Sequence, residues 1–184
     1  MRLLLNFILC LLLAACSFTP KETTLVIYST NDMHAQIDNY AKVAAFLDNE
    51  RSKYKNMLIL SGGDMFSGNP VVDQHTEKGL PIIQLMNQTG YRYAAFGNHE
   101  FDYLEKGLSD MLNAAKASGD PLPAIVEANY LPPVEGDPAY TADSAAVWAA
   151  FENYGVQDYM ILERGGLYFV IFGVMGVDSN DCAP

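Results

Sequence analysis

Cysteine is scarce in this chain of 184 residues, which has only three, Cys10, Cys16 and Cys182. The first two lie in an N-terminal segment that we expect to be processed, so Cys182 is the one unmodified thiol left in the mature chain. A single thiol cannot form an internal disulfide, which excludes a disulfide-stabilised framework. We interpret Cys182, close to the chain end, as a loop thiol or a small apolar filler.

Basic residues are also few: 11 Lys and Arg face 22 Asp and Glu, which gives a formal net charge of −11 and a pI of about 4.5. Such an acidic chain is not expected to reach nucleic acid or anionic lipid through bulk electrostatics. If the substrate is an anion, local positive charge must come from another source, and a bound metal ion could supply it. We expect no nucleic-acid partner, and the sequence predicts no particular protein partner.

The sequence has no apolar run long enough to span a bilayer comfortably, which takes about 20 residues. Its first apolar run, from Leu3 to Leu13, follows Arg2 and ends in small residues, as secretory signals do. The segment Leu-Ala-Ala-Cys at 13–16 resembles the lipobox of bacterial lipoproteins, in which cleavage precedes the cysteine that then carries the lipid. We predict a lipoprotein signal peptide over 1–15 and lipidation of Cys16, with an ordinary secretory signal as the alternative.

Processing at this point removes one basic residue and no acid, so the formal charge falls from −11 to −12. Residues 16–23 form a short polar tether. Several acyl chains would hold the protein firmly to a membrane, because each buried CH₂ contributes about 0.8 kcal/mol. We therefore expect an exported protein of the bacterial cell envelope, lipid-anchored to the membrane in the periplasm or at the cell surface.

The rest of the chain alternates strands and helices. Runs rich in β-branched and aromatic residues predict buried strands at 24–29, 56–64, 91–97 and 124–130. Apolar residues at helical spacing predict helices at 37–54, with Asp38 as N-cap, and at 80–90 and 100–119; 145–155 is a candidate short helix. This order indicates an α/β fold built around a layered sheet.

A hairpin is predicted at 159–177, turning at Gly165 and Gly166. Its second strand, Leu-Tyr-Phe-Val-Ile-Phe followed by Gly-Val-Met-Gly-Val, is almost wholly apolar and should be buried on both faces. An uncovered apolar edge is an aggregation hazard. We therefore expect further sheet downstream of Pro184, so that the chain is a fragment.

Polar side chains follow each of the first three predicted strands. Because the carboxyl ends of strands in an open α/β sheet line one crevice, topology alone should bring these side chains together. The candidates come from the segments Ser-Thr-Asn-Asp-Met-His, Ser-Gly-Gly-Asp and Gly-Asn-His-Glu-Phe-Asp, and they are Asp32, His34, Asp64, Asn98, His99 and Asp102.

These residue types suit a pair of divalent cations. Asp32 and His34 can bind one ion, Asp64 can bridge two through its two oxygens, and Asn98 offers a carbonyl oxygen to the second. Mixed oxygen and nitrogen ligands are compatible with Mn, Zn, Mg, Fe or Co. Two metals about 3.5–4 Å apart can activate a water and hold the oxygens of a phosphoryl group. His99 would then face the phosphate or leaving group, with Asp102 orienting its imidazole.

Taken in order, D-x-H, G-G-D and G-N-H-E-x-D resemble the motifs of the calcineurin-like metallophosphoesterases, in particular the 5′-nucleotidase and 2′,3′-cyclic-nucleotide phosphodiesterase branch. The resemblance implies the metallophosphatase fold, a layered β-sandwich flanked by helices, incomplete here at its C-terminal side. Residues 24–184 would be the N-terminal part of the catalytic domain, and the family's C-terminal substrate-binding domain would be absent.

By position, the resemblance makes Asp32, His34, Asp64 and Asn98 metal ligands and His99 with Asp102 the catalytic pair; Asn98 and His99 would also contact the substrate phosphate. It implies hydrolysis of nucleotides or related phosphoesters by water activated at two metal ions.

The sequence departs from this family in one important respect. Later Gly-His and Gly-His-x-His motifs supply further ligands in the family, but here no histidine follows His99. We therefore expect this chain alone to be inactive, or nearly so, as an N-terminal part of a phosphohydrolase. The alternative is a truncated, non-catalytic lipoprotein remnant with at most weak metal binding.

Overall fold

A parallel four-stranded sheet forms the centre of the molecule. The computed structural model describes residues 22–179. The strands are β1 (Val26–Thr30), β2 (Met57–Ser61), β3 (Tyr93–Ala94) and β4 (Ala124–Ile125), and they lie side by side in sequence order. The register pairs Val26 with Met57 and Thr30 with Ser61. All four strands thus point the same way, so the loops that follow them meet at one edge of the sheet.

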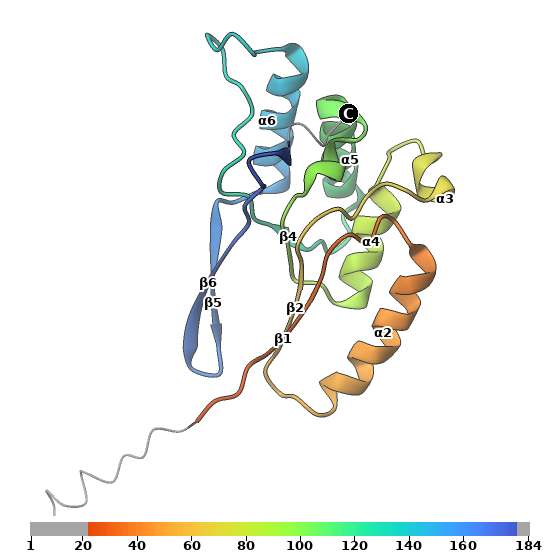
Figure 1. The fold of residues 1–184 in the computed structure, drawn as a ribbon, viewed down its shortest axis with the longest axis vertical. Coiled ribbons are helices and arrows are strands. Elements are labelled where there is room, and N and C mark those ends of the chain that lie inside the picture. The colour runs from red at the N-terminus through yellow and green to blue at the C-terminus, as the bar shows by residue number, and fades with distance from the viewer. Residues whose placement is uncertain (1–21, 180–184) are drawn as a thin grey trace, which may run out of the picture.

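Helices connect the strands and pack on one face of this sheet. They are α2 (Ile37–Arg51), the short α3 (Pro70–Asp73), α4 (Leu80–Thr89), α5 (Leu104–Ser118) and α6 (Ala142–Tyr154). Figure 1 shows α2, α4 and α5 on one side of the strands and the hairpin on the other. The core lies between helices and sheet, with Ile82, Leu112 and Ile125 fully buried. The arrangement confirms the predicted α/β class.

Element boundaries depart from the predictions in three places. Strands β3 and β4 have two residues each instead of the seven-residue runs expected. The helix predicted at 100–119 is split into a 3-10 turn, η1 (Asn98–Phe101), and α5. The N-cap of α2 is Gln36, so Asp38 lies in the first turn. The loops after β3 and β4 therefore begin earlier than predicted. After β3, the chain stops pairing with its neighbours and forms part of the sheet edge where the polar motifs lie.

The first strand is only half buried. Its residues alternate between intermediate and exposed, and Ile27 is 53% exposed. The prediction of a buried strand was therefore wrong for β1. Helices cover one face of the sheet and leave the other open at this edge, so alternate side chains meet solvent.

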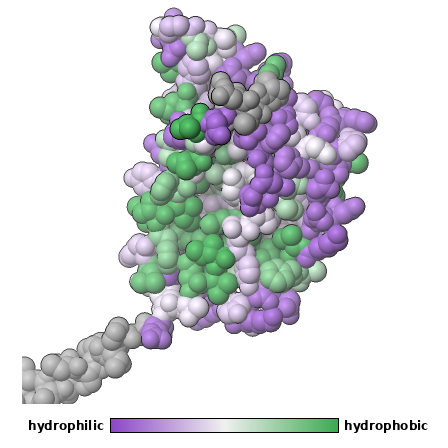
Figure 2. Space-filling model, viewed as in Figure 1, coloured by the Kyte–Doolittle hydropathy of each residue, from purple (hydrophilic) through white to green (hydrophobic). Residues whose placement is uncertain are grey.

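The C-terminal hairpin forms a separate two-stranded sheet. Strands β5 (Tyr159–Arg164) and β6 (Leu167–Phe172) pair antiparallel and turn at Gly165 and Gly166, as predicted. Its apolar second strand, which the sequence indicated would need further sheet to cover it, is exposed in this chain: Tyr168 is 74% exposed and Phe172 is 61% exposed. Figure 2 shows apolar side chains gathered on this side of the molecule, over the hairpin and the neighbouring sheet.

Three hydrogen bonds fix the end of the hairpin against the end of β4. The Ala128 N–H donates to the Gly173 carbonyl at 2.9 Å. The Asn129 side chain donates to the Met175 carbonyl and accepts from the Met175 N–H, both at 2.8 Å. A Cβ on Gly173 would clash with the Val126 carbonyl oxygen, so only glycine permits this approach.

Within residues 22–179, none of the helices has the length and apolar character needed to cross a bilayer.

Replacing Gly173 with alanine should therefore destabilise the protein, because the new methyl group meets backbone that cannot rotate away. We expect a loss of about 1–3 kcal/mol in the free energy of unfolding, as overpacking commonly costs. Gly62→Ala is the matched control, since its added Cβ would have no contact closer than 3.5 Å. Chemical denaturation of both variants measures the difference. Equal stabilities would show that the close approach at Gly173 does not require glycine.

Candidate metal centre

The loops after β1 and β2 are joined by a short ladder of backbone hydrogen bonds. The Asp32 N–H donates to the Gly63 carbonyl at 3.2 Å, His34 to Asp64 at 3.0 Å, and Ala35 to Met65 at 2.8 Å. The two loops therefore run together past the ends of their strands. This pairing places His34 beside Asp64 although 30 positions separate them in the sequence.

Four residues of these loops adopt a left-handed backbone that side chains rarely take. Asp32, His34, Ala35 and Asp64 have φ of 53°, 43°, 52° and 55°. Each such residue costs roughly 1–3 kcal/mol and persists only where surrounding contacts enforce it, and such strain clusters at functional sites. Here the interloop hydrogen bonds provide that enforcement, and the strain coincides with three of the predicted metal ligands.

A second crossing brings the loop after β3 against the loop after β2. A Cβ on Gly63 would lie 2.5 Å from the Gly97 nitrogen, and a Cβ on Gly97 would clash with Asp64 Oδ1. Only glycine at both positions lets the two backbones touch. The contact carries the next residues, Asn98 and His99, to the side of Asp64.

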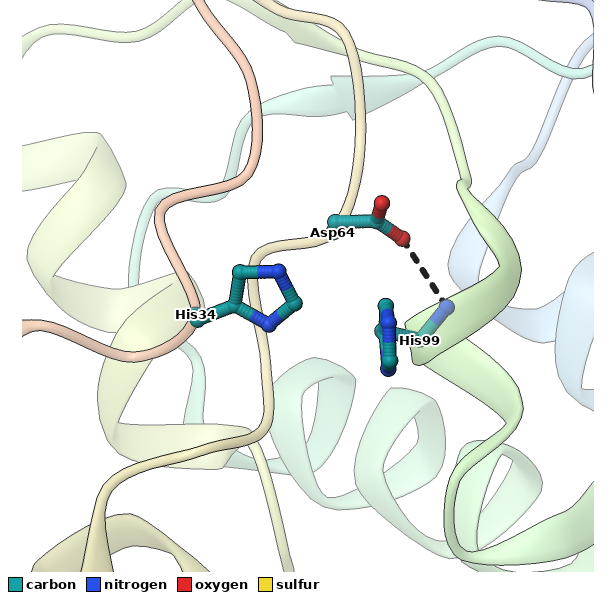
Figure 3. Close-up of side chains that lie close together, drawn as sticks. All are labelled: His34, Asp64 and His99. Carbon is teal, nitrogen blue, oxygen red and sulfur yellow. Dashed lines mark hydrogen bonds between the residues drawn. The ribbon is translucent and has the colours of Figure 1, made fainter. Parts of the chain in front are cut away.

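Three side chains from these three loops converge on one place. His34, Asp64 and His99 each offer one ligand atom within 4.8 Å of the other two. The imidazoles of His34 and His99 meet edge to face with ring centroids 4.6 Å apart. Asp64 Oδ1 accepts the His99 backbone N–H at 2.9 Å. Figure 3 shows the three side chains around a common space.

The donor set fits a divalent cation. Ligand atoms bound to one ion at about 2.0–2.2 Å lie at most about 4.4 Å apart, so small side-chain rotations would bring these three atoms onto one ion. Imidazole nitrogen with carboxylate oxygen is a ligand combination used by Zn, Mn, Fe and Co. His99 is part of this group, although the sequence assigned it to catalysis and not to metal binding.

The His99 imidazole is oriented by a carboxylate. Its Nδ1 lies 3.0 Å from both oxygens of Asp102, and the Ser67 hydroxyl donates to Asp102 Oδ2. Partial burial lowers the pKa of His99, but the hydrogen bond and charge of Asp102, with the charges of Asp64 and Glu100, outweigh it, so the net pKa is raised. The pairing predicted between His99 and Asp102 is present, and it leaves Nε2 free to face a ligand.

Of the remaining predicted ligands, Asp32 lies outside this group of three. Asp32 is exposed, and its carboxylate accepts a hydrogen bond from the Asn31 side chain. Asn98 is partly buried at the start of η1, one residue from His99. Both belong to the loops that form the site, but their roles as ligands stay predictions. Cys16, the predicted lipidation site, lies outside the described residues.

Sequence reasoning missed the residue that holds the site together. Glu100 was not among the candidate site residues, but it is 3% exposed, and its two oxygens accept four backbone N–H groups. Oε1 accepts from Met65 at 2.6 Å and Phe66 at 3.3 Å; Oε2 accepts from Asp64 at 2.9 Å and Gly97 at 2.6 Å. The carboxylate thus ties the loop after β2 to the loop after β3.

Burial raises the pKa of Glu100 to about 7, although the N–H groups of Gly97, Met65 and Asp64 oppose the shift. Both oxygens act only as acceptors, which is the arrangement that an ionised carboxylate requires. A signal was available in the sequence: an acid directly after an apolar strand and a glycine turn. Its partners in the loop after β2 could not be read there, because they lie 34–36 positions away.

Comparison with known proteins agrees with this geometry. The sequence pattern of the calcineurin-like phosphoesterases matches residues 25–176. The chain is 30% identical over 175 residues to the trifunctional nucleotide phosphoesterase YfkN of Bacillus subtilis, an alignment covering 87% of this chain and 12% of that protein. It is 26% identical over 154 residues to a 2′,3′-cyclic-nucleotide 2′-phosphodiesterase/3′-nucleotidase of Haemophilus influenzae, covering 73% and 22%.

Among solved structures, a 5′-nucleotidase precursor from Thermus thermophilus superimposes with a TM-score of 0.65 at 26% identity. The superposition covers 86% of this chain and 30% of that one. The chain therefore spans less than a third of the length of each of these three proteins.

Glu100→Gln should loosen the site without a change in side-chain size. Whichever way the amide points, its nitrogen replaces one acceptor and leaves two buried N–H donors unsatisfied. At about 1–3 kcal/mol each, the loss in unfolding free energy is roughly 2–6 kcal/mol. Glu152→Gln, on the exposed side of α6, is the control. Urea denaturation at pH 8 compares the two variants. A Glu100 variant as stable as the control would show that the Glu100 carboxylate does not hold the two loops together.

Proposed function

Because the chain belongs to the calcineurin-like phosphoesterases, we propose that it carries one wall of a metal-dependent phosphohydrolase site that releases phosphate from nucleotides or related phosphoesters. The observation that supports this most strongly is the convergence of His34, Asp64 and His99 from three separate loops. Relatives named as nucleotidases and nucleotide phosphodiesterases point to the substrate class.

The proposed chemistry divides between ions and protein. Two divalent metals would supply a water of lowered pKa and positive charge opposite the phosphoryl oxygens. Asp32 and His34 would hold one ion, Asn98 the other, and Asp64 would bridge them. Asp64 suits this role because its Oδ1 accepts the His99 N–H, which orients the carboxylate.

His99 has the geometry of a group that acts on the substrate. With Nδ1 held by Asp102, the free Nε2–H can donate to a phosphate oxygen or give its proton to the leaving oxygen. The raised pKa keeps a larger fraction of the ring protonated near neutral pH. Asn98 would contact the same phosphate from the adjacent position.

We expect this chain by itself to be inactive. Its three histidines are His34, His75 and His99, and His75 lies in an exposed segment beside Glu77. The second ion would then have only Asp64 and Asn98, too few protein ligands to fix it. The alternative function is weak metal binding without catalysis, which this shortage of ligands would leave.

Metal binding tests the site directly. Isothermal titration of Mn²⁺ into the chain should show binding that Asp64→Asn weakens by at least about tenfold, because the shared carboxylate is lost. Asp38→Asn, an exposed acid in the first turn of α2, is the control and should bind as the wild type does. If Asp64→Asn and Asp38→Asn bind equally well, the metal site and the function built on it are wrong.

The same protein samples test inactivity. Phosphate release from AMP with Mn²⁺ should not exceed that of the Asp64→Asn variant. Robust release that depends on Mn²⁺ and disappears in that variant would overturn the expectation of inactivity while supporting the phosphohydrolase site.

We also propose that the protein is exported and anchored to the bacterial envelope by a lipid on Cys16. The support is the signal pattern and the Leu-Ala-Ala-Cys sequence at 13–16. Cells fed radiolabelled palmitate should label the wild type and Cys182→Ser equally and leave Cys16→Ser unlabelled. Label retained in Cys16→Ser, or absent from the wild type, would rule out this anchor.

A further inference from the structure

A cavity of about 500 Å³ lies at the edge of the sheet opposite the candidate metal centre. Its walls include Met57, which begins β2, and Arg92, which precedes β3. The metal-site loops follow the other ends of these strands. The two places are therefore separated by the length of the sheet, and the cavity is no part of the phosphohydrolase site.

The cavity gathers positive charge in an otherwise acidic protein. Four basic residues from separate segments line it, and no acid does: Arg51, Lys55, Arg92 and Arg164. The whole chain has only 11 basic residues and a net charge of −11. About a third of the chain's basic residues therefore line one cavity, which the composition alone could not reveal.

Three of these cations have no counter-charge among residues 22–179. Arg51 is fixed by Asp48 at 2.5 Å and by the Thr89 carbonyl at 2.9 Å. By contrast, the side chains of Lys55, Arg92 and Arg164 make no hydrogen bond or ion pair within the described part of the chain. Arg164 Nε is buried there without any acceptor. A buried donor without a partner is unfavourable, and an anion in the cavity would supply the missing acceptor.

The chain enters the fold beside this cavity. The Thr23 hydroxyl donates to the Gly165 carbonyl at 3.1 Å, in the turn next to Arg164. The Asn56 side chain donates to the Thr24 carbonyl at 3.4 Å, next to Lys55. Figure 1 shows the start of β1 and the hairpin turn at the same end of the molecule. Seven residue steps separate Thr23 from Cys16, at most about 25 Å of extended chain.

We propose that this cavity binds a phosphate group carried by an organic ligand. Guanidinium groups match phosphate oxygens with paired N–H donors, and the Arg164 Nε would take part in such a pair. The volume exceeds that of a bare phosphate, and Tyr54, Met57 and Ile59 offer apolar surface to the attached group. Two sources share this chemistry: the headgroup of an anionic phospholipid, within reach of the proposed anchor, and a soluble phosphate compound.

The test is calorimetric binding to the full chain in EDTA, so that no metal at the other site contributes. The probes are monomeric dihexanoyl phosphatidylglycerol, dihexanoyl phosphatidylcholine and inorganic phosphate. Arg92 is exposed, so Arg92→Gln removes a cation without disturbing the core. We expect it to weaken binding about fivefold or more, the effect of roughly 1 kcal/mol per basic residue at an anionic surface. Lys42→Gln, exposed at the other half of α2, should have no effect.

The ligand series identifies the source. Binding of phosphatidylglycerol but not of inorganic phosphate or phosphatidylcholine would assign the site to an anionic headgroup, and binding of inorganic phosphate as well would assign it to a soluble phosphate. Arg164→Lys keeps the charge and loses the paired donors, so it should weaken either ligand. Absence of binding to every probe, or equal losses in Arg92→Gln and Lys42→Gln, would overturn the proposal. None of these outcomes depends on the metal site.

Discussion

The buried carboxylate of Glu100 is the interaction on which the candidate site depends. It accepts four backbone N–H groups from two loops that follow different strands. Because these N–H groups point inward at the ends of short strands, they would otherwise be buried without acceptors. Their satisfaction fixes where Asp64 stands relative to Gly97, and with it the distance between Asp64 and His99. The residues proposed for chemistry are thus positioned by one that takes no part in it.

The rest of the site follows from the same constraint. Where the loops after β2 and β3 touch, a side chain at Gly63 or Gly97 would clash, so both positions need glycine. The loop after β1 completes the cluster by hydrogen bonding to the loop after β2. The strained φ of Asp32, His34 and Asp64 is maintained by these contacts. A site assembled in this way is pre-organised, because backbone hydrogen bonds fix the loops that carry the ligand side chains.

Features that depend on a few neighbouring residues, such as helix ends and tight turns, could be predicted from the sequence. The stop of α4 at Gly90 and the hairpin turn at Gly165 and Gly166 depend on the backbone freedom of glycine, and both are present. The convergence of three motifs followed from the rule that parallel strands end at one edge. Exposure of Ile27 could not be predicted, since it depends on which face of the sheet the helices cover. The partners of Glu100 and the grouping of Arg92 with Arg164 arise only when distant segments meet.

The central claim is that His34, Asp64 and His99 surround the place of a divalent ion. A crystal of the chain grown with Zn²⁺ and measured at the zinc absorption edge tests it most directly. We expect an anomalous peak about 2.0–2.2 Å from a nitrogen of His34 and an oxygen of Asp64. A structure with these loops in place and zinc bound only elsewhere, or nowhere, would contradict it.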